Sequence, residues 1–217
     1  MIISYVKKII FIKTKKTAST SIEISLSEFC SDRCIITPIS LRDEETRKAL
    51  GFLGPQNYAI RDDSSDKILS IFNHMPTVKI RQIFPDEWRN FLKIAVVRNP
   101  FDVAISRYYW EGGERTGLNF GDYVAIHKAH LSENSFIAPI SGLDAPDLFI
   151  KYENLATDLE IAGLGFLLST LSKVKAKGNI RPAHGSSVTE MFDRYPEAAD
   201  VVRLQCADYI SHFDYEV

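Results

Sequence analysis

Cysteine, long apolar runs and net charge are all scarce in this 217-residue sequence, and each shortage excludes a class of protein. Only three cysteines occur, Cys30, Cys34 and Cys206, and this small odd number argues against a disulfide framework and suits a reducing compartment. The sequence predicts no metal site, because no histidine or cysteine pair at zinc-finger spacing accompanies Cys30 and Cys34. With 26 basic and 28 acidic residues the net charge is −2, so any anion site must be a local cluster.

The lack of a long apolar run also bears on location. No segment approaches the roughly 18 apolar residues of a membrane span, and the charge requires neither a nucleic-acid nor a membrane partner. The opening segment MIISYVKKIIFIK is basic and apolar, but its lysines interrupt the apolar run and no small-residue cleavage site follows. We interpret this segment as a buried strand, and we expect a soluble, cytoplasmic protein.

What is present is an ordinary globular composition, 45% hydrophobic and 25% charged, of a length that favours one domain over residues 1–217. Short β-branched runs alternate with amphipathic segments, which is typical of α/β proteins with a mostly parallel central sheet and helices on both faces. Residues 41–67 are polar, and we expect a short helix and a long loop there. We expect strands at 9–13, 34–38, 93–98 and 147–152, and helices at 19–29, 67–72, 77–84, 86–92, 102–110, 121–131, 154–171 and 196–213.

One candidate site lies in the segment FIKTKKTASTS, residues 11–21, where a strand is expected to lead into a helix. The N–H groups and the dipole of a helix N-terminus favour an anion, and lysine and hydroxyl side chains add further donors. The segment therefore predicts a phosphate-binding loop, and the alternative is a basic, hydroxyl-rich cap in solvent. The Walker A pattern G-x-x-x-x-G-K-[ST] is missing, and Lys16 precedes the hydroxyl residues.

A second candidate site lies in VVRNPFDVAISRYY, residues 96–109. Arg98 would stand at the carboxyl end of a buried strand, which is the edge where ligands bind in open α/β sheets, and Ser106 in the next helix. A guanidinium group can clamp a phosphate through two parallel hydrogen bonds. Alternatively, Arg98 forms a structural salt bridge, for example with Asp102, and Ser106 is an ordinary helix residue. Two anion sites at two strand ends suggest one ligand with two phosphate groups.

Together the two segments resemble the sulfotransferase family that uses 3′-phosphoadenosine 5′-phosphosulfate (PAPS), in its carbohydrate or bacterial-type branch. KTASTS, residues 16–21, is similar to the family's 5′-phosphosulfate loop, P-K-T-G-G-T-S. Lys15 stands where proline is usual, and Ala18 and Ser19 replace the glycine pair. RNPFDVAISRYY, residues 98–109, is similar to the family's 3′-phosphate motif, R-[ND]-P-x-[DE]-x-x-x-S-x-Y.

The resemblance implies a P-loop NTPase-like sulfotransferase fold and assigns roles to individual residues. Lys16 would contact the sulfuryl group and the bridging oxygen, and would therefore be catalytic. Arg98 and Ser106 would bind the 3′-phosphate. PAPS would be the co-substrate, with no metal required. The 5′-phosphosulfate would be held by the loop residues Lys15, Lys16, Thr17, Ala18, Ser19, Thr20 and Ser21.

Transfer to an alcohol also requires a general base, ideally with a pKa near the working pH. Members of the carbohydrate branch often carry a histidine in the stretch corresponding to FNHMP, so His74 is the first candidate; otherwise it would cap the following helix. His184, in the late loop KAKGNIRPAHGSS, is the second candidate, and Arg181 would contact the nucleotide if that loop closes over it. We interpret Glu23 as a helix-start charge.

The acceptor would be a carbohydrate or a small alcohol. The aromatic residues Tyr108, Tyr109, Trp110 and Phe120 either line its pocket or belong to the core. Two other functions remain open. A P-loop-like nucleotide kinase or NTPase would bind ATP with Mg²⁺, and a non-catalytic binder of a phosphorylated or sulfated ligand would bind the nucleotide without turnover.

Overall fold

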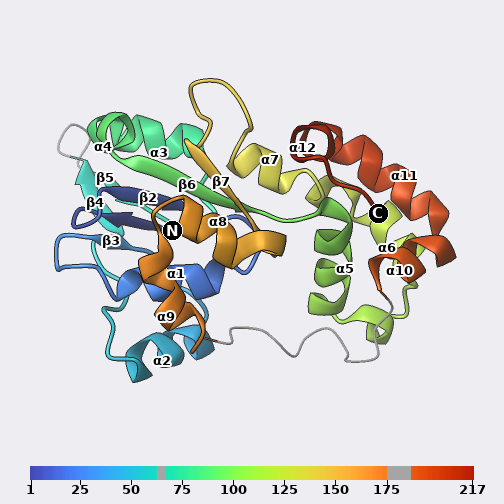
Figure 1. The fold of residues 1–217 in the computed structure, drawn as a ribbon, viewed down its shortest axis with the longest axis horizontal. Helices are drawn as coiled ribbons and strands as arrows, with labels where there is room; N and C mark the ends of the chain where they lie inside the picture. The colour runs from blue at the N-terminus through green and yellow to red at the C-terminus, as the bar shows by residue number, and fades with distance from the viewer. Residues whose placement is uncertain (63–66, 175–186) are drawn as a thin grey trace.

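The computed structural model describes residues 1–62, 67–174 and 187–217. Within them the central sheet has five strands in the order β3-β1-β2-β6-β7 (Figure 1). Strands β2, β6 and β7 pair in parallel, whereas β1 runs antiparallel to both of its neighbours. The expected mostly parallel sheet is therefore a mixed sheet with a parallel centre. Its strands are β1 Ile2–Ser4, β2 Ile9–Ile12, β3 Ile35–Ile36, β6 Leu92–Val97 and β7 Leu148–Lys151.

Helices cover both faces of the sheet, as expected (Figure 1). Alternate side chains of a strand point to opposite faces, so Ile9 and Phe11 pack on one side of β2 and Ile10 and Ile12 on the other. The first side is covered by α1 Ser19–Ser27, α8 Leu155–Ile161, η4 Gly165–Leu167 and α9 Leu168–Leu171. The second side is covered by α3 Thr77–Ile83, α4 Pro85–Asn90 and α7 Glu133–Ile137.

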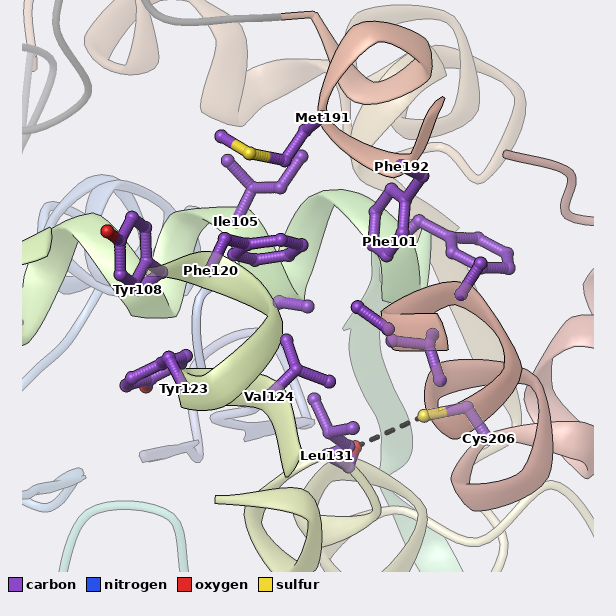
Figure 2. Close-up of a cluster of buried hydrophobic side chains, with 14 residues drawn as sticks. Phe101, Ile105, Tyr108, Phe120, Tyr123, Val124, Leu131, Met191, Phe192 and Cys206 are labelled. Carbon is purple, nitrogen blue, oxygen red and sulfur yellow. Dashed lines mark hydrogen bonds between the residues drawn. The ribbon is translucent and has the colours of Figure 1, made fainter. Parts of the chain in front are cut away.

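A second core lies beside the sheet, among helices that follow β6 (Figures 1 and 2). It is rich in aromatic residues that meet edge to face, such as Phe101 with Phe192 and Tyr108 with Phe120, an arrangement that adds to their hydrophobic burial. Because α5 begins directly after β6, this core fixes the helix that carries Ser106. The helices are α5 Pro100–Trp110, α6 Phe120–Ile126, α10 Val188–Arg194 and α11 Pro196–Gln205.

The N-terminal segment is a hairpin of two strands, so the expectation of one strand is wrong. Its register pairs Ile2 with Phe11 and Ser4 with Ile9. The exposed lysines Lys7 and Lys8 lie in the turn between the strands, and Lys8 adopts a positive φ of 53°. The charges that interrupt the apolar run therefore mark a reversal of the chain.

Residues 41–67 contain the expected short helix, α2 Leu41–Ala49, but the helix expected at 67–72 is wrong. Lys67–Ser70 is strand β5, and it pairs antiparallel with β4, Ala59–Asp62. A short apolar run fits a strand as well as a helix, and here a partner strand decides the outcome.

Three long helices expected from periodicity are divided in the structure. The helix at 121–131 is α6 followed by η2 Lys128–His130, and the helix at 154–171 is η3 Tyr152–Asn154, α8, η4 and α9. The C-terminal helix breaks at Cys206 into α11 and α12 Ala207–Phe213. This break lets α11 pack on α5 and α6 while Tyr209 and Phe213 of α12 pack on Val97. A further turn, η1 Gly113–Thr116, follows α5. None of the helices in the described ranges is both long and apolar enough to cross a bilayer.

Candidate functional site

The loop after β2 enters α1 through two residues in the left-handed conformation. Lys16 has φ 64°, and Ala18, the N-cap of α1, has φ 57°. For a residue other than glycine this conformation costs about 1–2 kcal/mol, and such strain is stored mainly at functional sites. Within the described residues no side chain caps α1 at Ala18. The Ser21 N–H donates to the Ala18 carbonyl at 3.0 Å, whereas the N–H groups of Ser19 and Thr20 have no partner among the described residues and are left for a ligand.

Two of the four hydroxyl groups in KTASTS, those of Thr17 and Ser19, hold the loop itself together with Thr14. Thr14 Oγ1 donates to the Val96 carbonyl at 2.6 Å, so the 2.8 Å contact between the Thr14 and Thr17 hydroxyls has Thr17 as donor. Ser19 Oγ donates to the Thr14 carbonyl at 2.6 Å. Thr17 and Ser19 could therefore serve an anion through their backbone N–H groups while these bonds persist.

The other two hydroxyl groups face the ligand side of the loop. The side chains of Thr20 and Ser21 line the cavity described below and form no hydrogen bond with any other described residue. Each hydroxyl can therefore donate to a bound anion without breaking an existing contact.

The three lysines before the hydroxyl run have different surroundings. Lys13 is buried and forms an ion pair with Glu23, and Lys15 Nζ lies 3.0 Å from Glu133 Oε1. Lys16 Nζ lies 4.2 Å from the ring centroid of Trp110, on α5. A cation over an aromatic face is held at a defined distance while its ammonium hydrogens can still reach an anion.

Arg98 stands at the carboxyl end of β6, and its guanidinium group connects the two candidate motifs. Its Nε and Nη2 donate to Asp102 Oδ2 at 2.8 and 2.5 Å, and its Nη1 donates to the Lys16 carbonyl at 3.0 Å. The expected alternative, a salt bridge to Asp102, is thus present. Three of the five N–H donors of a guanidinium are used by these residues, which leaves two that an anion can accept. Tyr152, directly after β7, stacks 4.2 Å from the guanidinium.

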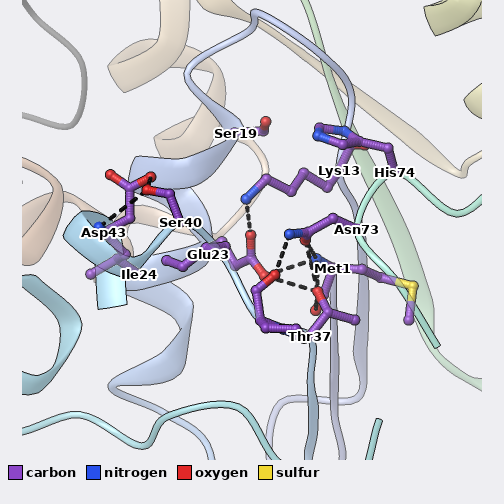
Figure 3. Close-up of polar contacts among 12 residues, drawn as sticks. Met1, Lys13, Ser19, Glu23, Ile24, Thr37, Ser40, Asp43, Asn73 and His74 are labelled. Carbon is purple, nitrogen blue, oxygen red and sulfur yellow. Dashed lines mark hydrogen bonds and ion pairs between the residues drawn. The ribbon is translucent and has the colours of Figure 1, made fainter. Parts of the chain in front are cut away.

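The His74 side chain lies beside the loop, and a carbonyl of the loop backbone holds its ring (Figure 3). Its Nδ1 is 2.8 Å from the Lys13 carbonyl, which can only accept, so Nδ1 carries the proton and Nε2 is the basic nitrogen. Burial lowers the pKa of His74 to about 4, against the opposing effect of the bond to Lys13. The imidazole is therefore neutral at pH 7, with Nε2 unprotonated, but this pKa lies below the value near the working pH that is expected of a general base.

Glu23 is not a helix-start charge, because it lies beyond the first turn of α1 and is fully buried. It accepts hydrogen bonds from the Met1 amino group at 2.8 Å, from Lys13 and from Thr37 (Figure 3). Burial on its own would raise the pKa of Glu23, but the Met1 and Lys13 charges lower it to about 2. Since Lys13 also supplies the carbonyl that orients His74, this buried network supports the base.

These elements surround a single cavity of about 740 Å³, a size within the usual range for ligand pockets of roughly 300–1,000 Å³. The predicted site residues that it brings together are Lys15, Lys16, Thr17, Ala18, Ser19, Thr20, Ser21, His74, Arg98 and Ser106. The cavity is also lined by residues for which the sequence predicts no ligand role, namely Lys13, Ile39, Ser40, Asp43, Asn73, Arg107, Glu111 and Tyr152.

The sequence could have placed some of these residues at the cavity, but not others. Tyr152 follows a predicted strand, so the rule that ligands bind at the carboxyl ends of strands could have found it. Ser40 and Asp43 begin α2, and nothing in the sequence brings that helix to the loop. Among the aromatic residues considered for the acceptor, Trp110 lines this cavity, whereas Tyr108 and Phe120 are buried in the helical core (Figure 2).

Two predicted residues, Arg181 and His184, lie outside the described residues. Across residues 1–62, 67–174 and 187–217, no group of three or more histidine, cysteine, aspartate or glutamate side chains is arranged to hold a metal ion. A scan of the sequence against models of known protein families and a search of curated protein sequences both found no match.

Proposed function

We propose that this protein transfers a sulfuryl group from PAPS to a hydroxyl group of a carbohydrate or small alcohol. The observation that carries the proposal is the hydrogen bond from Arg98 Nη1 to the Lys16 carbonyl, which joins two anion-binding motifs across one cavity. A nucleotide with phosphates at its 3′ and 5′ positions would need two such sites a short distance apart. The resemblance of both motifs to the sulfotransferase family supports the same conclusion.

Donor binding would use both motifs. The 5′-phosphosulfate would lie against the N-terminus of α1, where backbone N–H groups, the helix dipole and the Thr20 and Ser21 hydroxyls favour negative charge. The 3′-phosphate would accept the two remaining donors of Arg98 and the hydroxyl of Ser106, which lies on α5 and has no side-chain hydrogen bond to another described residue.

The reaction would be a direct in-line transfer. The acceptor oxygen forms a bond to sulfur while the bond from sulfur to the bridging phosphate oxygen breaks, and the acceptor proton passes to His74 Nε2. Adenosine 3′,5′-bisphosphate leaves with the electron pair of the broken bond. Lys16 and the loop N–H groups stabilise the charge that builds on its phosphate oxygen, which is the kind of preorganised stabilisation that contributes most to catalysis.

A binding comparison followed by a transfer assay tests the proposal. Calorimetry should show that adenosine 3′,5′-bisphosphate binds and that ATP with Mg²⁺ binds much more weakly. Mass spectrometry of hydroxyl acceptors incubated with labelled PAPS should then show a sulfated product. Preference for ATP with Mg²⁺ would favour a kinase or NTPase, and nucleotide binding without transfer to any acceptor would favour a non-catalytic binder.

A further inference from the structure

Asn134, on α7, forms two hydrogen bonds with the loop between β2 and α1, here called the phosphate loop. They are the same two bonds that a neighbouring strand would form. Its Oδ1 accepts from the backbone N–H of Lys15 at 2.7 Å, and its Nδ2 donates to the carbonyl of Lys15 at 2.9 Å. The two bonds require opposite ends of the amide, so they fix its orientation. Lys15 directly precedes Lys16, the first left-handed residue of the loop.

These bonds are formed where the sheet stops supporting the chain. The register of β2 with β6 ends at Ile12 and Ala95, and Lys15 lies beyond it. The Thr14 hydroxyl bond to Val96 continues the link to β6, and Asn134 supplies the next one. Because Lys16 and Ala18 are both strained, the loop needs outside contacts to keep this conformation.

α7 gives Asn134 a rigid base. Ile137 and Ala138 are buried in the core on one face of the sheet, and the buried Tyr209 hydroxyl lies within hydrogen-bond distance of the carbonyls of Asn134 and Ala138. Asn134 is therefore held from the side opposite the loop as well as by it.

The neighbouring residue, Glu133, extends the support to the second motif. It pairs with Lys15 Nζ and with Arg107, the residue that follows Ser106 on α5. Partial burial alone would raise the pKa of Glu133, but the hydrogen bond from Lys15 and the charge of Arg107 lower it, so it is ionised at pH 7. α7 thus contacts both motifs of the cavity.

We infer that Asn134 is a positioning residue that holds the phosphate loop in its strained, anion-binding conformation. The inference rests on the proposed function only for the identity of the ligand. If the loop takes this conformation in only about a tenth of molecules once the Asn134 hydrogen bonds are lost, the apparent Kd for the ligand rises about tenfold.

The test compares Asn134→Ala with Asn119→Ala. Asn119 caps α6 by accepting from Asp122, so its loss destabilises the helical core without touching the loop. In calorimetry with adenosine 3′,5′-bisphosphate, the stoichiometry measures the fraction of folded protein, and Kd measures the affinity of the folded site. Hydrogen exchange of the peptide covering residues 13–22 reports the loop with no ligand at all.

We expect Asn134→Ala to raise Kd about tenfold and to speed exchange in residues 13–22, whereas Asn119→Ala changes neither. If Asn134→Ala does not fold, the nearly isosteric Asn134→Asp, which loses the donor to Lys15, should change exchange in the same direction. Unchanged exchange in the loop, or an equal rise of Kd in both variants, would overturn the inference. If the wild type does not bind the nucleotide but Asn134→Ala still exchanges faster in the loop, the result would support the positioning role of Asn134 and reject the proposed ligand.

Discussion

Replacing Ala18 with glycine should stabilise this protein, although the same change destabilises a helix. Ala18 is left-handed with φ 57° and ψ 13°, a conformation that costs alanine about 1–2 kcal/mol and glycine almost nothing. Glycine also gains freedom in the unfolded chain, which opposes this by about 0.4–1 kcal/mol. The difference is a net stabilisation of about 0.5–1 kcal/mol. At roughly 2–4 °C per kcal/mol for a chain of this size, this raises Tm by about 1–4 °C.

Urea unfolding of Ala18→Gly beside Ala125→Gly measures the effect. Ala125 is an exposed residue of α6, so its change to glycine should lower the free energy of unfolding by about 1 kcal/mol. The two variants should shift the midpoint in opposite directions at an unchanged slope. A similar loss of stability in both would show that Ala18 is not left-handed and that the loop is not strained as described.

Three further changes test the site and its support. Lys16→Ala should lower turnover with PAPS about 10²-fold, the scale of one lost charge-stabilising donor, and wild-type turnover would refute its role. The folded pKa of His74, about 4, lies below its ordinary value of 6.5, so folding stability should fall as the pH drops from 6.5 to 4. Asparagine tolerates the positive φ of 58° at this position. In acid denaturation, the folding stability of His74→Asn should therefore fall less than that of the wild type between pH 6.5 and 4, and the variant should lose transfer activity. Glu23→Gln should cost about 3–5 kcal/mol in urea unfolding because it leaves Lys13 buried without its carboxylate, whereas Glu160→Gln at an exposed position should cost little.

The parts of the fold that the sequence predicts are those where local pattern and environment agree. β2 (IIFI) and β6 (LKIAVV) are mostly apolar runs rich in β-branched residues and are buried apart from Leu92, and Pro85 begins α4 as proline favours. The helix expected from 102 begins earlier, at Pro100. The errors come from tertiary partners. Lys67–Ser70 is a strand because Ala59–Asp62 lies opposite, and the C-terminal helix breaks at Cys206 because its halves pack on different cores.

The candidate site divides in the same way. Residues in the two motifs, such as Lys16 and Arg98, are found from sequence because each follows a predicted strand, and parallel strands end at one edge. Asn134 could not be found, since it lies 119 positions from Lys15 and reaches it only through the packing of α7. The burial of Glu23 was missed because a carboxylate near a helix start is usually exposed, and its buried partners come from distant segments.

The central claim is that the cavity binds both phosphates of one nucleotide, with Arg98 on the 3′-phosphate. The most direct test is the ratio of Kd values for AMP and adenosine 3′,5′-bisphosphate, measured by calorimetry in wild type, Arg98→Lys and Arg203→Lys. Arg203 pairs only with the exposed Asp200 among its ionic contacts in the described chain, so it serves as the matched control. Wild type and Arg203→Lys should both prefer the bisphosphate by tenfold or more, the scale of one charge-assisted hydrogen bond, and Arg98→Lys should lose most of that preference. Equal affinity of the wild type for the two nucleotides, or an unchanged ratio in Arg98→Lys, would contradict the account.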